Sequence, residues 1–147
     1  MSRRAAIAAA VLVFLALSFE LARYLSAPGA ERGDVFAVLK AEARGDSAGV
    51  LARLPACSAD AACSNLVRTN VPRLRHAGHV KILLLESGSA YTLSSKTAVT
   101  RVAWATLNPA GPTHVQCVTV HKRWNFLSGA STSLLRISAP IGLEASC

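Results

Sequence analysis

Two histidines three residues apart, His76 and His79, form the closest pair of side chains that could do chemistry together. On a helix they would share a face and could hold a metal ion. Gly78 lies between them, however, and places the pair where a helix ends and a strand begins, with no acidic partner nearby. We therefore interpret them as surface histidines in a loop and predict no metal site.

The remaining groups do not assemble into a catalytic motif. His114 and His121 are seven residues apart on an expected strand, so they should point to opposite faces of a sheet. After Asp60 the only acids are Glu86 and Glu144, which offer no converging pair for acid–base work. No serine stands in a Gly-x-Ser-x-Gly or Ser-x-x-Lys motif, and no glycine-rich loop could hold a phosphate. We predict no catalysis and no cofactor.

The four cysteines, Cys57, Cys63, Cys117 and Cys147, all follow the N-terminal apolar segment. An even number in an exported domain favours disulfides, and four cysteines allow three pairings. We expect Cys57 to pair with Cys63 and Cys117 with Cys147. The spacing between Cys57 and Cys63 fits neither a Cys-x-x-Cys redox motif nor a zinc site.

The N-terminal segment Ala5–Phe19 is apolar and follows Arg3 and Arg4. A span needs about 20 residues, and the helical pattern can continue to Leu25. Basic residues before the segment hold the N-terminus in the cytoplasm. We therefore predict a signal anchor over residues 1–25, with the rest of the chain outside the plasma membrane. The alternative is a signal peptide cleaved near Ala16-Leu17-Ser18, which would release a secreted domain.

The 147-residue chain is basic, with 16 Lys and Arg against 8 Asp and Glu and a net charge of +8. The basic residues are scattered, with no basic run and no aromatic platform, so we predict no nucleic-acid partner. A basic domain outside a membrane could instead contact anionic lipid or an acidic envelope polymer. The alternative is that the basic residues form a solvated surface that binds no partner.

A short tether rich in Pro and Gly, residues 26–33, is expected before one domain at 34–147. Apolar spacing predicts that the first part of this domain is helical. The expected helices are Asp34–Gly45, begun by Asp34 as N-cap; a second one, capped by Asp46 or Ser47 and stopped by Pro55; and Ser64–Arg75, kinked or split by Pro72.

Strands follow the helices. His79–Glu86 is apolar on both sides, which favours a central strand. Helices before a run of strands indicate an α+β fold, with helices on one face of a curved antiparallel sheet. The further expected strands are Ala90–Leu93, Ala98–Leu107, Thr113–Phe126 and Ser131–Ala139, with a turn at Asn108–Pro112 between the second and third of these. In the last strand, alternation predicts that Ser133, Leu135, Ile137 and Ala139 face inward.

The run Phe36–Leu54, two helices joined at Gly45-Asp46, resembles the opening of nuclear-transport-factor-2-like (cystatin-like) domains. The resemblance extends in outline over Asp34–Ala139 and implies helices on one face of the sheet with a cavity between them. It departs from many relatives at Cys57–Cys63, where they place a strand or hairpin. Membrane-anchored members often act as subunits of envelope assemblies, which is an analogy only.

One weak binding constellation comes from this resemblance. Tyr91, Arg101, Trp104 and His121 could line the concave side of the sheet, where related domains hold ligands. Arg101 and Trp104 are three residues apart, so on a regular strand they face opposite ways, which counts against the set. The alternative is that Trp104 and Trp124 serve packing.

We therefore expect a membrane-anchored extracytoplasmic domain without catalysis, acting as a scaffold or accessory subunit of an envelope assembly. The alternative is a small-ligand or lipid-binding module that uses the cavity between helices and sheet. An exported enzyme is a third and weaker interpretation.

Overall fold

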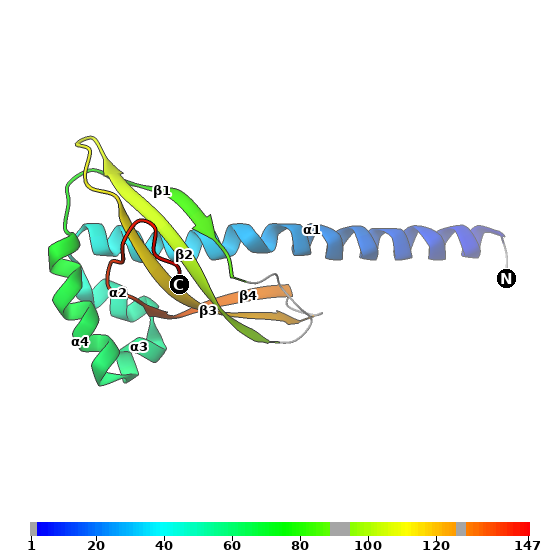
Figure 1. The fold of residues 1–147 in the computed structure, drawn as a ribbon. Coiled ribbons are helices and arrows are strands. Elements are labelled where there is room, and N and C mark those ends of the chain that lie inside the picture. The colour runs from blue at the N-terminus through cyan, green and yellow to red at the C-terminus, as the bar shows by residue number, and fades with distance from the viewer. Residues whose placement is uncertain (1–2, 89–94, 126–128) are drawn as a thin grey trace.

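The computed structural model describes residues 3–88, 95–125 and 129–147, in which helices pack on an antiparallel sheet (Figure 1). The expected α+β class is confirmed, because the helices come first and the described strands form one sheet in the order β1-β2-β3-β4. The expected strand Ala90–Leu93 lies outside the described residues. The helices are α1 (Arg3–Ala43), α2 (Ser47–Arg53), α3 (Pro55–Ala59), α4 (Ala61–Asn70) and a 3-10 turn (Val71–Leu74); the strands are β1 (His79–Glu86), β2 (Lys96–Leu107), β3 (His114–Asn125) and β4 (Gly129–Ile137).

Helix α1 is continuous from Arg3 to Ala43, so the tether expected at residues 26–33 is helical and Asp34 is not an N-cap. Proline and glycine weaken a helix, and Pro28 removes one helix hydrogen bond. Tertiary packing overrides this local preference, because Val35, Val38 and Leu39 are fully buried against the rest of the domain. The sequence around Pro28 shows the local preference against a helix, but it does not show the sheet on which the helix packs.

The N-terminal part of α1 projects beyond the sheet (Figure 1). Its large apolar side chains between Ile7 and Leu17 are 51–68% exposed and lie on all sides of the helix. In the residues that the structure describes, no helix combines the length and the apolar character that a membrane crossing requires.

The end of α1 and the helices after it follow the local sequence signals. Gly45 has φ +74°, and its amide donates to Glu42 O at 2.8 Å, which ends the helix as expected. Asp46 caps α2 by accepting from the amide of Gly49 at 2.8 Å. Pro55 ends the second helix and also starts α3, and the expected split at Pro72 is confirmed, since α4 ends at Asn70 and a 3-10 turn follows.

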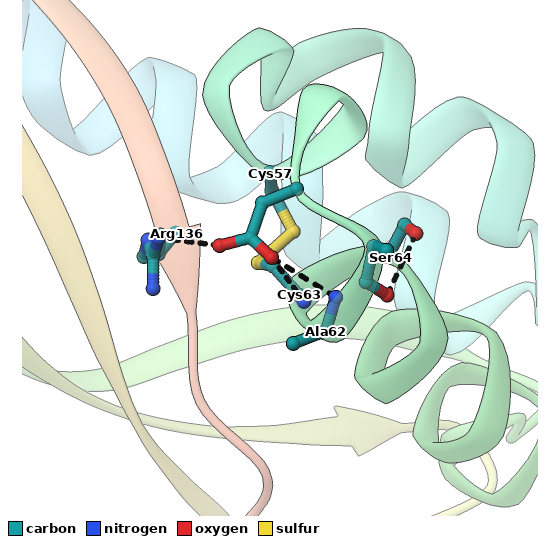
Figure 2. Close-up of polar contacts among 7 residues, drawn as sticks. Cys57, Ala62, Cys63, Ser64 and Arg136 are labelled. Carbon is teal, nitrogen blue, oxygen red and sulfur yellow. Dashed lines mark hydrogen bonds and ion pairs between the residues drawn. A yellow bond between two sulfur atoms is a disulfide. The ribbon is translucent and has the colours of Figure 1, made fainter.

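The segment Cys57–Cys63, where many members of the resembled family have a strand or hairpin, spans the end of α3, the corner at Asp60 and the start of α4. Asp60 caps α4 by accepting from the amides of Ala62 and Cys63 at 2.9 and 3.3 Å. Its other carboxylate oxygen pairs with Arg136 of β4 at 2.5 Å. Figure 2 shows Arg136 reaching this corner beside the Cys57–Cys63 disulfide. The corner is thus attached to the sheet by one ion pair and closed on itself by one disulfide.

Strand β1 has the expected bounds but lies at an edge of the sheet, not at its centre. Among the described strands it pairs with β2 alone, with a register shift between Ile82 and Leu84. Leu83 and Leu84 remain 49% and 43% exposed. A run that is apolar on both sides suits a central strand, but the pattern does not reveal how many neighbours the strand has.

The inward-facing residues of β4 also differ from the expectation. Leu134 pairs with Val120 and Ile137 with Val118, and both are buried, whereas Ser133 is exposed. The register shifts opposite Thr119 and Val120, so one extra residue of β4 interrupts the simple alternation. Ile137 therefore faces inward as expected, and Leu134 takes the place expected for Ser133 and Leu135.

The C-terminal tail crosses the face of the sheet opposite to α1 (Figure 1). Cys147 is bonded to Cys117 of β3, so both expected disulfides are present with the expected pairing. Arg101 of β2 donates to the carbonyls of Ala145, at 2.9 Å, and Leu143. Two independent contacts therefore hold the tail against the sheet.

A buried ion pair joins α1 to strand β3 of the sheet. Glu31 lies 2.7 Å from the Lys122 ammonium, and their side chains are only 3% and 2% exposed. Thr100 donates to the Glu31 carboxylate at 2.7 Å and Ser87 at 3.0 Å, while Lys122 also donates to Ser87. A buried charge is tolerated when it is paired and hydrogen-bonded in this way. The cluster therefore fixes the helix to β2, β3 and the end of β1.

Replacing Glu31 with Gln should destabilise the domain by about 3 to 5 kcal/mol, because Lys122 would be left as a buried charge without its counter-ion. The free energy of unfolding of the full chain in neutral detergent is read from denaturant titration. Arg44→Gln, which removes an exposed pair with Asp46 at 3.9 Å, should change it by no more than about 0.5 kcal/mol. Equal effects of the two variants would contradict this role for the buried pair.

The two disulfides should contribute unequally. Cys117–Cys147 closes a separation of 30 residues and Cys57–Cys63 one of 6. Loop-closure entropy then assigns about 3 to 4 kcal/mol to the first and about 2 kcal/mol to the second. The Cys117→Ser/Cys147→Ser double variant should therefore unfold at a lower denaturant concentration than Cys57→Ser/Cys63→Ser. The reverse order would refute this ranking.

Candidate functional site

The four residues of the expected ligand cavity are not brought together in the part that the structure describes. Arg101 faces the outer side of the sheet, where it pairs with Glu86 at 3.2 Å and holds the C-terminal tail. His121 lies on the same side, with its Nδ1 3.3 Å from Thr97 Oγ1. Trp104 is buried on the helix side, and Tyr91 lies outside the described residues.

The histidines occupy two separate places. His114 and His121 face opposite sides of β3, as expected. His114 stacks near Trp104 at a ring distance of 5.0 Å and near His76 at 5.9 Å, and burial, followed by the charge of His76, lowers the pKa of His114. His79 is exposed. Among the described residues no three potential ligands converge on a metal position.

A buried acid that the sequence reasoning missed lies near the C-terminal end of α1. Glu42 is almost fully buried, and its Oε1 accepts from Gln116 Nε2 at 3.2 Å. Gln116 in turn accepts from the Trp104 indole at 2.7 Å and donates to Ser138 O at 3.2 Å. The spacing of Glu31, Val35, Val38 and Glu42 on one helix face was the signal that could have revealed both buried acids.

Burial raises the pKa of the Glu42 carboxyl to about 7, and the hydrogen bond from Gln116 opposes this rise. Its second oxygen has no hydrogen-bond partner among the described residues. The carboxyl can exchange a proton near neutral pH, and it is not among the residues that line the three depressions described below. Glu42 is therefore placed to make the stability of the domain depend on pH.

Two surface depressions between α1 and β1 share Phe36 and Val80 in their lining, and we call them together the α1–β1 groove. The first has a volume of about 440 Å³ and the second about 200 Å³. The first combines apolar side chains and two glycines with two basic residues, and the second combines apolar side chains with two basic residues and two histidines. The lining residues are Gly29, Arg32, Gly33, Phe36, Val80, Lys81 and Ile82 in the first depression, and Phe36, Lys40, Ala43, Arg44, His76, Gly78, His79 and Val80 in the second.

A third depression, of about 260 Å³, lies on the other side of α1 against β4. Asp34 and Arg53 both line it, so its charges offset one another. Burial raises the pKa of Asp34. The α1–β1 groove differs because no acid is among its lining residues.

Over the residues that the structure describes, the fold is that of an α+β domain in which one long helix crosses a meander of four antiparallel strands. In comparisons with known proteins, no family model, no curated protein and no solved structure matches the chain.

Replacing Glu42 with Gln should remove a pH dependence of stability. The pKa rises from 4.5 to about 7 on folding, so the stability that depends on a protonated Glu42 is complete below pH 4.5 and is lost as the pH rises to about 7. This loss amounts to about 3 kcal/mol. Denaturant unfolding from pH 5 to pH 8 should show a decline in the native chain that is about 3 kcal/mol larger than in Glu42→Gln.

Comparing the two chains isolates Glu42, because the contribution of His114 is common to both. The lowered pKa of His114 acts in the opposite direction, since stability is lost as the pH falls and the ring must take up a proton. Parallel pH profiles for the native chain and Glu42→Gln would show that the Glu42 carboxyl ionises normally in the folded state.

Proposed function

We propose that this protein is a membrane-anchored extracytoplasmic domain that serves as a scaffold or accessory subunit of an envelope assembly. One observation carries the proposal: α1 is a single helix with an exposed apolar N-terminal part and a C-terminal part built into the core. A helix that is apolar on all sides needs an apolar environment. The described helix does not reach the length and apolar character of a membrane crossing. The single-pass anchor is therefore proposed from the exposed apolar segment Ala5–Leu25 and from Arg3 and Arg4 before it, which would hold the N-terminus in the cytoplasm.

Location outside the cytoplasm agrees with the cysteine chemistry. All four cysteines are paired, and disulfides persist in oxidising compartments. Since both disulfides indicate an extracytoplasmic or secreted domain, the anchor decides between the two alternatives. Retention of Ala5–Leu25 gives the anchored form, and cleavage gives the secreted form.

An accessory role is supported by the free edge of β1. Its Leu83 and Leu84 are half exposed, and Val99 of the neighbouring strand is 40% exposed. An edge strand with exposed apolar side chains offers unpaired backbone groups and apolar area to a protein partner. The proposal gives the domain no catalysis, because the buried Glu42 and the buried Glu31–Lys122 pair both lie in the packed interior.

The order of elements supports a domain of the nuclear-transport-factor-2-like type. Helices precede the strands, and α1 lies across one face of an antiparallel sheet (Figure 1). The interior between α1 and the sheet is occupied by side chains such as Trp104 and Val102. A large enclosed ligand cavity is therefore not part of this proposal.

The anchor is tested by intact mass and by extraction of membranes that contain the full chain. We expect the uncleaved mass, lowered by the four hydrogens that two disulfides remove, and we expect the protein to stay in the membrane pellet at alkaline pH. Leu12→Lys/Leu15→Lys should release it into the supernatant, because each charge costs about 3 kcal/mol at a bilayer centre.

Leu66→Lys/Leu143→Lys is the matched control, since both leucines are exposed outside the apolar segment. This variant should remain in the pellet. A native protein that has lost the apolar segment would support the secreted form and overturn the anchor. Release of the native, full-length protein at alkaline pH would overturn it as well.

A further inference from the structure

We infer that the α1–β1 groove binds an anionic amphiphile, with a phosphate-bearing headgroup at its basic end and an alkyl chain along its apolar floor. This inference goes beyond the proposed function and does not depend on it, because the groove belongs to the extracytoplasmic domain whether or not the anchor is retained.

The floor of the groove is apolar and continuous. Phe36 of α1 and Val80 of β1 line both depressions, and Ile82 extends the surface in the larger one. Phe36 remains 39% exposed although it lies on the part of α1 that is built into the core. Volumes of about 440 and 200 Å³ lie in or near the range of small-molecule sites, which is about 300 to 1,000 Å³.

The rim is basic. Arg32 and Lys81 line the larger depression, and Lys40 and Arg44 line the smaller one, where His76 and His79 also lie. Lys40 lies in the last turn of α1, and Arg44 directly follows the end of this helix at Ala43, so both cations lie at the C-terminal end of α1. A cluster of cations with no acid among the lining residues attracts an anion, and several N–H donors can converge on phosphate oxygens.

These cations are not neutralised by the rest of the described chain. No ion pair of Arg32, Lys40 or Lys81 is found among the described residues, and Arg44 has only a long and exposed contact with Asp46 at 3.9 Å. The acid nearest in sequence to Arg32 is Glu31, which is buried and forms its ion pair with Lys122. The rim charges are therefore available to an external anion.

Two helical glycines leave room for the chain of the amphiphile. Gly29 and Gly33 are one helical turn apart, and both line the larger depression. A Cβ added at either position would meet no atom within 4 Å. Each glycine costs about 1 kcal/mol relative to alanine in a helix, so packing within the domain does not explain their presence. They keep the groove open.

The combination of floor and rim selects the ligand class. A free inorganic anion would use the cations but not Phe36, Val80 and Ile82, and a neutral amphiphile would use the floor but not the cations. Only a molecule that carries both an anionic headgroup and an alkyl chain uses the cations and the apolar floor together.

Calorimetric titration of the full chain in dodecyl maltoside tests the inference with three probes: hexyl phosphate, hexanol and inorganic phosphate. One hexyl phosphate should bind per chain, at least about tenfold tighter than either of the others, because only it meets both floor and rim. Lys40→Gln/Lys81→Gln should weaken it by about tenfold or more, through loss of charge-assisted contacts.

Gly33→Leu should abolish hexyl phosphate binding by filling the groove, while helicity and the unfolding midpoint stay the same or rise, because nothing stands where the new side chain goes. Arg68→Gln/Arg73→Gln is the charge-matched control on α4 and the 3-10 turn, outside the groove, and should stay within about twofold of the native affinity.

Three results would overturn the inference. Equal affinity for inorganic phosphate and hexyl phosphate would mean a simple anion site, and equal affinity for hexanol would mean an apolar crevice without a role for the cations. An equal loss in the Lys40/Lys81 and Arg68/Arg73 variants would mean that net surface charge alone attracts the probe. None of these results bears on membrane extraction, so failure here leaves the anchor proposal untouched.

Discussion

The buried pair between Glu31 and Lys122 is the interaction on which the arrangement of this protein depends. It places a carboxylate of α1 and an ammonium of β3 in contact at 2.7 Å, with Thr100 and Ser87 completing their hydrogen bonds. Either charge would be costly if it were buried without the other, so α1 and β3 pack together only in the arrangement that brings Glu31 and Lys122 into contact. The pair thereby determines the orientation of α1, and with it the direction in which the exposed apolar part points away from the domain (Figure 1).

With α1 fixed in this way, the part of the helix that packs on the domain has two distinct faces. The inward face carries Val35, Val38 and Leu39 between two buried acids, of which Glu31 is paired with a cation and Glu42 is not. The face toward β1 carries glycines and cations and stays open as the α1–β1 groove. Disulfides and the Asp60–Arg136 pair hold the elements farther from α1. One helix thus supplies an exposed apolar segment, part of the core and one wall of the groove.

Features that depend on local chemistry were predictable from the sequence. Neighbouring residues account for the class of fold, the bounds of β1, the helix end at Gly45 and the break at Pro72. The disulfide pairing follows from the short separation of Cys57 and Cys63 and from the even number of cysteines. The misplaced features depend on distant partners. Residues 26–33 are helical where Glu31 accepts a hydrogen bond from Thr100, 69 positions later in the chain. The edge position of β1 and the register shift in β4 are properties of strand pairing, which alternation does not encode.

The central claim is that α1 runs without interruption from the apolar segment into the core. The most direct measurement is a pulsed electron–electron distance between nitroxide labels at Ala22→Cys and Lys40→Cys in the full chain. Both sites are exposed, and all native cysteines are paired, so only the new thiols take the label. Eighteen residues of helix make five turns, so a narrow distribution near about 27 Å is expected. A broad distribution, as a flexible tether over residues 26–33 would give, would contradict the continuous helix.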